Sequence, residues 1–175
     1  MIETWFISDT HFGHKNILEY EKDARPFSTI KEMNEVIIER WNHTVNRNDI
    51  VFHLGDFAFG RHNISIAERL NGKKKLIMGN HDTYPSADYC RYFTKLYGIL
   101  FWERCILSHI PVHPRQLGER WLLNVHGHLH SKHVLCSNDI CETLHEDPNY
   151  FNVSCEQNHL TPINADIIKE RLKTL

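Results

Sequence analysis

The feature that most constrains the fold of this chain is a repeated pattern, in which a short apolar stretch ends in a cluster of polar residues. It occurs three times in the first half of the chain, at 4–11, 50–56 and 75–82. Segments with helical spacing of their apolar residues precede the second and third stretches. Such alternation is typical of a largely parallel sheet, whose ligands lie beyond the carboxyl ends of the strands. We therefore expect an α/β fold with polar residues gathered at one sheet edge.

The predicted helices have recognisable start signals. Thr29 and Glu32 form a capping-box pattern, and apolar residues at helical spacing follow as far as Trp41. A second helix is predicted at 64–70, and Asn164 is placed to cap a last one. These helices would cover the sheet.

The second half of the chain has a different pattern. Apolar strands are predicted at 97–101, 105–108 and 121–125 with no strong helix between them, and 150–153 is a last strand. Such spacing suits antiparallel pairing in a second sheet packed on the first. No repeat or linker divides the chain, so one domain is expected over residues 1–175.

The first polar cluster lies between Ile7 and His14. Asp9 and His11 are two residues apart, so on a strand they would project to the same face. A carboxylate beside an imidazole is a donor set that first-row divalent metals prefer. Considered alone, the cluster is equally compatible with an aspartate that caps a turn beside an incidental histidine.

The composition favours a metal site. The chain has 14 histidines among 175 residues, several of them at predicted strand ends, and histidine is the commonest metal ligand. The five cysteines form no small disulfide framework, and we expect them to be reduced and mostly buried. The formal charge of −2 gives no electrostatic reason to expect general affinity for nucleic acid or membranes.

No apolar run approaches the roughly 18 residues of a membrane span. The first predicted strand begins at Thr4 with no basic or apolar leader before it. We therefore expect a cytoplasmic protein that does not contact membranes.

Five polar clusters in all follow apolar strands and would reach a common edge. They are Asp9-x-His11, Gly55-Asp56, Gly79-Asn80-His81-Asp82, Ser108-His109 and His126-Gly127-His128. Even without His81 and Asp82, they supply more ligands than one ion needs, and they suit two ions that share a carboxylate. Nitrogen and oxygen donors without thiolate favour manganese, iron, zinc, cobalt or nickel over calcium. Two such ions form the clamp used for in-line attack on phosphate esters.

In this order, the clusters resemble the pattern of the calcineurin-like metallophosphoesterases, which is D-x-H, G-D, G-N-H-D, a lone His and G-H-x-H. The clusters run from Asp9 to His128, about two-thirds of the chain. The stretch Asp-Thr-His-Phe-Gly-His at residues 9–14 resembles the sequences of a small, uncapped bacterial and phage branch of this family. The resemblance implies a four-layer α/β/β/α sandwich of two mixed sheets flanked by helices.

The resemblance also implies a site with two divalent ions, with manganese expected and iron, zinc, nickel or cobalt as alternatives. The first ion would be held by Asp9, His11 and His128, the second by Asn80, His109 and His126, and both by Asp56. A hydroxide between the ions would be the nucleophile. His81 would contact the phosphoryl group or protonate the leaving oxygen, and Asp82 would orient its ring. His113 competes with His109 for the lone histidine, but its flanking prolines suggest a loop.

Three further residues have two interpretations. His14, Arg25 and Arg61 would contact substrate from loops near the site, or would lie at the solvated surface. The segment with His130, His133, Cys136, Cys141 and His145 suggests a separate zinc site, although its spacing matches no standard finger. We favour a loop or hairpin there, which would shape the rim of the site or an oligomer contact.

The predicted function is metal-dependent hydrolysis of phosphate esters. Short intervals between the clusters leave no room for a cap, so small phosphodiesters or nucleotides are the preferred substrates. A phosphomonoesterase or nucleotidase is the first alternative, and a nuclease is the second, although no basic stripe supports a nucleic-acid groove. A non-enzymatic metal-binding interaction module is the alternative of another class, but relatives of that kind lose ligands that this chain retains. No oligomeric state is predicted.

Overall fold

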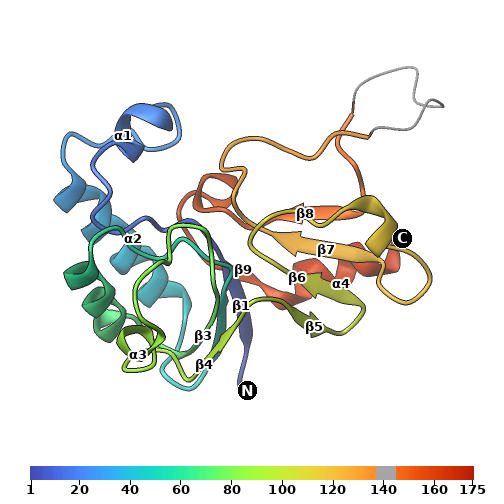
Figure 1. Ribbon diagram of the computed structural model, residues 1–175, viewed down its shortest axis with the longest axis horizontal. Coiled ribbons are helices and arrows are strands. Elements are labelled where there is room, and N and C mark those ends of the chain that lie inside the picture. Colours follow the sequence, from blue (N-terminus) through green and yellow to red (C-terminus); the bar gives the residue numbers. More distant parts are fainter. Residues whose placement is uncertain (137–144) are drawn as a thin grey trace.

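The computed structural model describes residues 1–136 and 145–175, in which two mixed β-sheets are flanked by helices (Figure 1). The strand order is β4-β3-β2-β1-β9 in the first sheet and β5-β6-β7-β8 in the second. The strands are β1 Thr4–Ile7, β2 Ile50–His53, β3 Lys73–Ile77, β4 Lys95–Tyr97, β5 Leu100–Trp102, β6 Cys105–Leu107, β7 Leu123–His126, β8 Tyr150–Asn152 and β9 Ile163–Asn164. The predicted sandwich of two mixed sheets with flanking helices is confirmed.

Two of the helices, α2 and α4, begin where capping residues predicted them. They are α1 Ile17–Tyr20, α2 Ile30–Thr44, α3 Ser86–Tyr89 and α4 Ala165–Lys173, with 3₁₀ helices η1 Arg61–Arg69, η2 Pro114–Gln116 and η3 Cys155–Asn158. At α2, the Thr29 hydroxyl accepts from the Glu32 N–H at 3.1 Å, and the Glu32 carboxylate accepts from the Ser28 N–H at 2.9 Å. At α4, the side-chain oxygen of Asn164 accepts from the Asp166 N–H at 2.9 Å. The helix predicted at 64–70 is the 3₁₀ helix η1. In the described part of the chain, no helix has the length and apolar character needed to span a bilayer.

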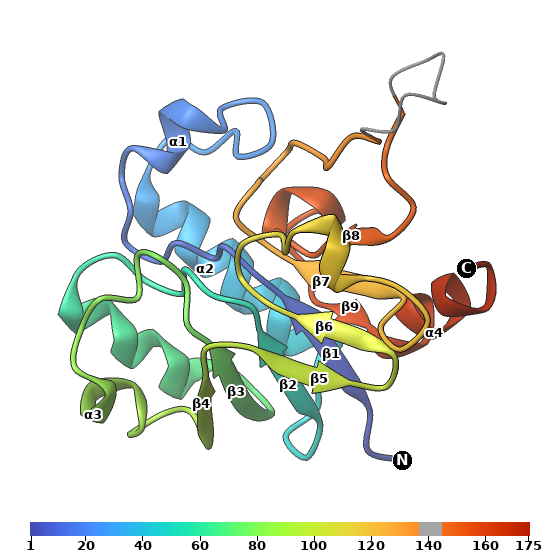
Figure 2. The same cartoon turned by 45° about the vertical axis from the view of Figure 1, so that its right-hand side comes forward.

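Two apolar cores hold the layers together. The first lies between the first sheet and its covering helices, and Met33, Ile37 and Trp41 of α2 are fully buried in it. The second joins the facing sides of the two sheets, with Phe52 from the first sheet and Val125 from the second. Figure 2 shows the second sheet lying over the first. Each such side chain contributes about 1.5–3 kcal/mol on burial.

The second sheet differs from the sequence prediction of antiparallel pairing. β5 and β6 are antiparallel, but β6, β7 and β8 run parallel to one another. Parallel neighbours need a crossover of roughly a dozen residues or more. Residues 108–122 and 127–149 supply such connections, and their described parts (108–122, 127–136 and 145–149) contain no helix longer than η2, which is why the absence of predicted helices was misleading. The single strand predicted at 97–101 is divided between β4 and β5, which lie in different sheets.

The parallel register places the polar clusters together. Ile7 at the end of β1 pairs with His53 of β2, and His53 pairs with Leu76 of β3. The three strands therefore end at the same edge of the first sheet. The second sheet reaches this edge at the end of β8, where the Ser8 N–H donates to the carbonyl of Val153 at 2.9 Å.

Candidate metal centre

The turns at this edge have strained backbones. Five residues there have positive φ without being glycine, and they carry carboxylate or imidazole groups. They are Asp9 (57°), His11 (47°), Asp56 (56°), His128 (69°) and His130 (52°). Left-handed conformations are unfavourable for side chains of this size, and they persist where the surrounding structure fixes them, often at functional sites. The strain therefore points to a role for these side chains beyond packing.

Backbone hydrogen bonds lock the first two turns side by side. The Asp9 N–H donates to the carbonyl of Gly55 at 3.0 Å, and the His11 N–H donates to that of Asp56 at 3.1 Å. The turn after β7 is fixed on the same pair, since the His128 N–H donates to Oδ2 of Asp9 at 2.9 Å. Three segments that lie far apart in the sequence thus present their side chains to one place.

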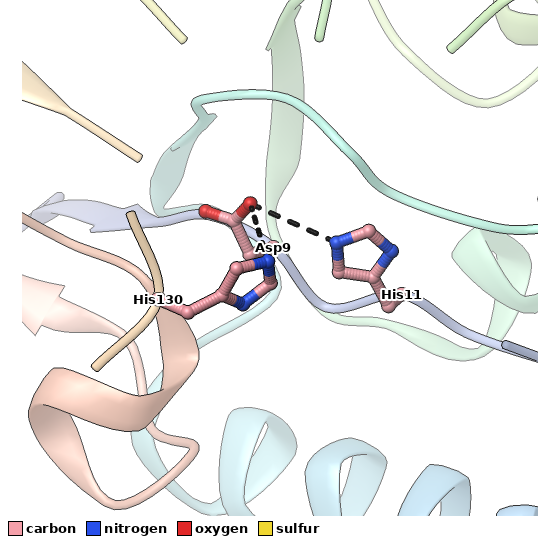
Figure 3. Close-up of side chains that lie close together, drawn as sticks. All are labelled: Asp9, His11 and His130. Atoms are coloured by element: carbon pink, nitrogen blue, oxygen red, sulfur yellow. Dashed lines mark ion pairs between the residues drawn. The ribbon is translucent and has the colours of Figure 1, made fainter. Parts of the chain in front are cut away.

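The first group of potential ligands consists of Asp9, His11 and His130, whose donor atoms lie within 4.8 Å of one another. Oδ1 of Asp9 is 3.8 Å from Nε2 of His11 and 3.9 Å from Nε2 of His130. Figure 3 shows both rings turned toward that one carboxylate oxygen. The group is deeply buried, with Asp9 at 0% exposure and His11 at 2%.

The second group consists of Asp56, His109 and His128. Nε2 of His109 lies 3.2 Å from Oδ2 of Asp56 and 3.0 Å from Oδ1 of Asn80. The other ring nitrogen of His109 donates to the carbonyl of Leu54 at 2.7 Å, which fixes the ring. Asn80 is therefore placed with this group, as the sequence predicted.

Asp56 lies between the two groups. Its Oδ2 is 3.2 Å from Nε2 of His109 in the second group and 3.7 Å from Nε2 of His11 in the first. Burial alone would raise the pKa of Asp56, but the hydrogen bond and charge of His109 lower it to about 2. Asp56 is therefore an anionic carboxylate at the point where two cations would share a ligand.

The donor set fits divalent ions. Oδ1 of Asp9 and both ring nitrogens of His11 are buried, and no hydrogen-bond partner exists for them in the described part of the chain. Burial lowers the pKa of His11 well below its usual range, so the ring is neutral and one of its two nitrogens has a lone pair available. Buried polar atoms without partners are costly, and cations between the carboxylates and imidazoles would satisfy them.

The last cluster differs from the prediction. His128 was expected beside Asp9 and His11, but it lies with the second group, where its ring centroid is 5.1 Å from that of His109. His130 takes the predicted place of His128. His126, expected in the second group, ends β7 with its Nδ1 donating to the carbonyl of Gly127 at 2.8 Å. Burial lowers the pKa of His126 to about 4.

The position of the turn after β7 explains why His128 and His130 differ from the prediction. A Cβ at Gly127 would lie 1.9 Å from Oγ of Ser8, so glycine is required where β7 ends against the first turn. The side chains after this glycine, His128 and His130, are the ones that reach the two groups. The frame Gly127-His128-Leu129-His130 is the signal in the sequence that identifies His130.

The acidic residue of the third cluster has a role other than the predicted one. Both oxygens of Asp82 accept from backbone N–H groups, those of Gly79 at 2.9 Å, Asp56 at 2.8 Å and Phe57 at 3.1 Å. Asp82 therefore holds the turn that carries Asp56 instead of orienting the ring of His81. Burial raises the pKa of Asp82 to about 6.

Two histidines border the centre. The side chain of His81 is 44% exposed and its ring lies 5.5 Å from that of His11, while the backbone N–H of His81 donates to Oδ1 of Asp56 at 2.8 Å. His14 lies beside it, with its ring 5.2 Å from that of His11 and 4.5 Å from that of Phe59. Both side chains lie against the first ligand group, on the side where His81 is partly exposed.

The two candidate arginines lie elsewhere. Arg25 has no exposed surface and lies beneath the first group, so the prediction that it contacts substrate is wrong. Arg61 forms a two-point ion pair with Asp88 at 2.7 and 2.8 Å, which engages its guanidinium away from the centre.

The His- and Cys-rich segment gives no second metal cluster within residues 1–136 and 145–175, where the two groups above are the only sets of three such donors. His133 pairs with Glu146 at 3.5 Å, and Leu135 forms an antiparallel bridge to Glu146, as the loop or hairpin prediction expects. Cys141 lies outside the described residues. Of the other cysteines, Cys105 and Cys155 are buried.

The amino-acid sequence and the fold of this chain are similar to those of known proteins. The family model for the calcineurin-like phosphoesterases matches residues 2–170. An uncharacterised protein of Methanocaldococcus jannaschii is 33% identical, with 96% of this chain and 90% of the relative covered. The gene 66 protein of Mycobacterium phage L5 is 27% identical over 77% of this chain and 81% of its own length. A solved structure, a protein of unknown function from Aquifex aeolicus, is similar with a TM-score of 0.72 and 27% identity, covering 97% of this chain and 99% of that one.

Proposed function

Because the chain belongs to the calcineurin-like phosphoesterase family, we propose that it hydrolyses phosphate esters with two divalent ions, manganese being the expected metal. The observation that carries this proposal is the position of Asp56 between the two ligand groups, 3.2 Å from His109 and 3.7 Å from His11. A carboxylate between two buried imidazole sets is the arrangement that a two-ion clamp requires.

We assign the ligands by the geometry of the two groups. The first ion would be held by Asp9, His11 and His130, the second by Asn80, His109 and His128, and both by Asp56. When bound, the two ions would activate a water molecule and offset the charge of the phosphate. The burial of both groups keeps this chemistry in a region of low dielectric, where electrostatic interactions are strong.

His81 is the residue that we propose to act on the ester itself. Its ring is at the open side of the centre, 4.0 Å from Oδ2 of Asp56, and it is partly exposed. From there its ring N–H would donate to a phosphoryl oxygen or to the leaving oxygen. His14 and Phe59 border the same opening and would contact the substrate beyond the phosphate.

A phosphodiester is the substrate class that we favour. Two hollows are candidates for the ester groups, one lined by ligands of the second group and the other lined by Phe59, whose ring lies 4.5 Å from that of His14. One, of about 380 Å³, is bordered by Asn80, His109 and Ile110. The other, of about 410 Å³, is bordered by Phe59 and Lys15. A diester carries two groups on its phosphorus, and each hollow would receive one of them.

We also propose that residues 1–175 act as a single domain, since the second core joins both sheets and α4. A cytoplasmic location is proposed on the buried thiols of Cys105 and Cys155, which suit a reducing compartment.

The substrate class is tested by hydrolysis assays with the Mn²⁺-loaded protein on a generic diester, a generic monoester and single-stranded DNA. We expect the highest kcat/KM on the diester, because both of its ester groups would find a hollow. A higher value on the monoester would refute the diester preference, and a higher value on DNA would indicate a nuclease. A protein that holds its ions but cleaves none of the three would favour a non-enzymatic module.

The control for these assays is His81→Asn, which removes the imidazole but none of the proposed ligands. We expect its kcat to fall about 10²–10⁴-fold while both ions remain bound, as measured by metal analysis of the purified protein. An unchanged rate would mean that His81 does not act on the ester, or that the activity belongs to a contaminating phosphatase.

A further inference from the structure

A buried arginine lies directly beneath the first ligand group. Arg25 has no exposed surface, and its guanidinium is fully engaged. It donates to the carbonyl of Asp9 at 2.5 Å and to that of Thr10 at 3.2 Å. On its other side it pairs with Glu156, with Nε and Nη2 at 2.7 and 2.6 Å from Oε1. Arg25 thus links the turn that carries Asp9 and His11 to a carboxylate 131 residues further along the chain.

Glu156 continues this link to the third member of the group. Its side chain is 1% exposed, and the same Oε1 accepts from Nδ1 of His130 at 3.0 Å. Because a carboxylate can only accept, the hydrogen of the neutral His130 ring is on Nδ1. Nε2 then keeps its lone pair and faces Oδ1 of Asp9 at 3.9 Å. Glu156 therefore selects the tautomer in which His130 can bind a metal ion.

The desolvation penalty of the buried Arg25–Glu156 pair indicates that the pair has a role other than stabilising the fold. Removing an arginine and a glutamate from water carries a large desolvation penalty, and a buried ion pair often stabilises a fold no more than apolar residues would. Here Arg25 holds the turn that carries Asp9 and His11 through the carbonyls of Asp9 and Thr10, and Glu156 contacts His130 directly. Members of the second group are fixed by other atoms, such as the Leu54 carbonyl that holds His109.

We propose that Arg25 and Glu156 are positioning residues for the first metal ion. Arg25 holds the strained turn of Asp9 and His11, and Glu156 orients His130 and sets its tautomer. The affinity of the first ion therefore depends on this pair, and the affinity of the second does not. The inference rests on the proposed two-ion function, but it concerns metal binding and not hydrolysis.

The test is a titration of the metal-free protein with Co²⁺, and the same titration of His130→Ala, expected to keep only the second site, identifies the absorption of the second ion. In Glu156→Gln, the amide oxygen still accepts but the charge is lost, and we expect the affinity of the first ion to fall about tenfold. In Glu156→Leu, the acceptor is lost as well, and the fall should approach about 100-fold. The other affinity should stay unchanged in both variants. Equal weakening of both ions, or of neither, would overturn the proposal.

A matched control separates positioning from general stability. Glu35→Gln breaks a two-point pair with Arg69, at 2.8 and 2.5 Å, that is exposed and includes no member of either ligand group. We expect it to leave both affinities unchanged. If Glu156→Leu does not fold, Glu156→Gln and Arg25→Lys carry the test, because each keeps the size and polarity of its site. A structural role alone would lower the unfolding temperature of the metal-free variants and leave the ratio of the two affinities as in the wild type.

A failure of this positioning proposal can be distinguished from a failure of the proposed phosphoesterase function. A wild-type protein that binds two ions but cleaves no phosphate ester would contradict the function and leave this inference standing. A wild-type protein that binds fewer than two ions would overturn both.

Discussion

Asp56→Asn is expected to lose at least about 10³-fold in kcat/KM on a phosphodiester, the largest effect of any single change in this chain. Asparagine keeps the shape of the side chain but removes the negative charge that lies 3.2 Å from His109 and 3.7 Å from His11. Without it, two cations would approach each other with no shared anion between them. Metal analysis of the purified variant should show both ions weakened, because Asp56 belongs to both groups.

The matched control is another buried aspartate. Asp49 is 1% exposed and accepts from the N–H groups of Glu3 and Asn46 and from the indole of Trp5. It lies just before β2, at the opposite end of that strand from Asp56. Asp49→Asn should lower the unfolding temperature while metal content and kcat stay near the wild type. Retention of both ions by Asp56→Asn would be inconsistent with a shared ligand.

The second large effect is expected at His130, in a comparison with His126. His130→Ala should lose one ion per chain and at least about 10²-fold in kcat/KM, because it removes a ligand of the first group. His126→Ala should keep both ions, since its ring contacts the Gly127 carbonyl and packs 6.0 Å from Tyr150 without reaching either group. Its effect should be a loss of about 1–3 kcal/mol in the free energy of unfolding.

Metal analysis, kcat/KM and chemical denaturation of the two variants make the comparison. The reverse outcome, with an ion lost from His126→Ala and both ions retained by His130→Ala, would restore the assignment expected from the sequence and reject the geometry.

The polar clusters could be predicted because strand ends are a local property of the sequence. The runs before Asp9, Asp56 and Asn80 are short and apolar, and parallel strands bring their ends to one edge whatever the details of packing. The capping of α2 and α4 was predictable for the same reason, since each depends on residues within one turn.

The assignment of His126, His128 and His130 to the two ligand groups was harder to predict, because it depends on backbone conformation. His128 and His130 have φ of 69° and 52°, and these left-handed turns decide which group each ring reaches. The resemblance to the family placed His126 in the second group. The close contact of Gly127 with Ser8 fixes the turn, and that contact joins segments more than 100 residues apart.

The role of Arg25 could not be predicted from its neighbours in the sequence. An arginine in a loop before a proline is normally solvated, and phosphate binding is its usual functional interpretation. Its burial becomes acceptable only because Glu156 and two backbone carbonyls surround it, and those partners come together only in the folded chain. Parallel pairing in the second sheet depends in the same way on long crossovers.

The central claim, that two ions share Asp56, is tested most directly by anomalous diffraction from crystals grown with Mn²⁺. We expect two peaks a few ångströms apart, one beside Asp9, His11 and His130, the other beside Asn80, His109 and His128, with the Asp56 carboxylate between them. A single peak, or a peak coordinated by His126, would contradict the account.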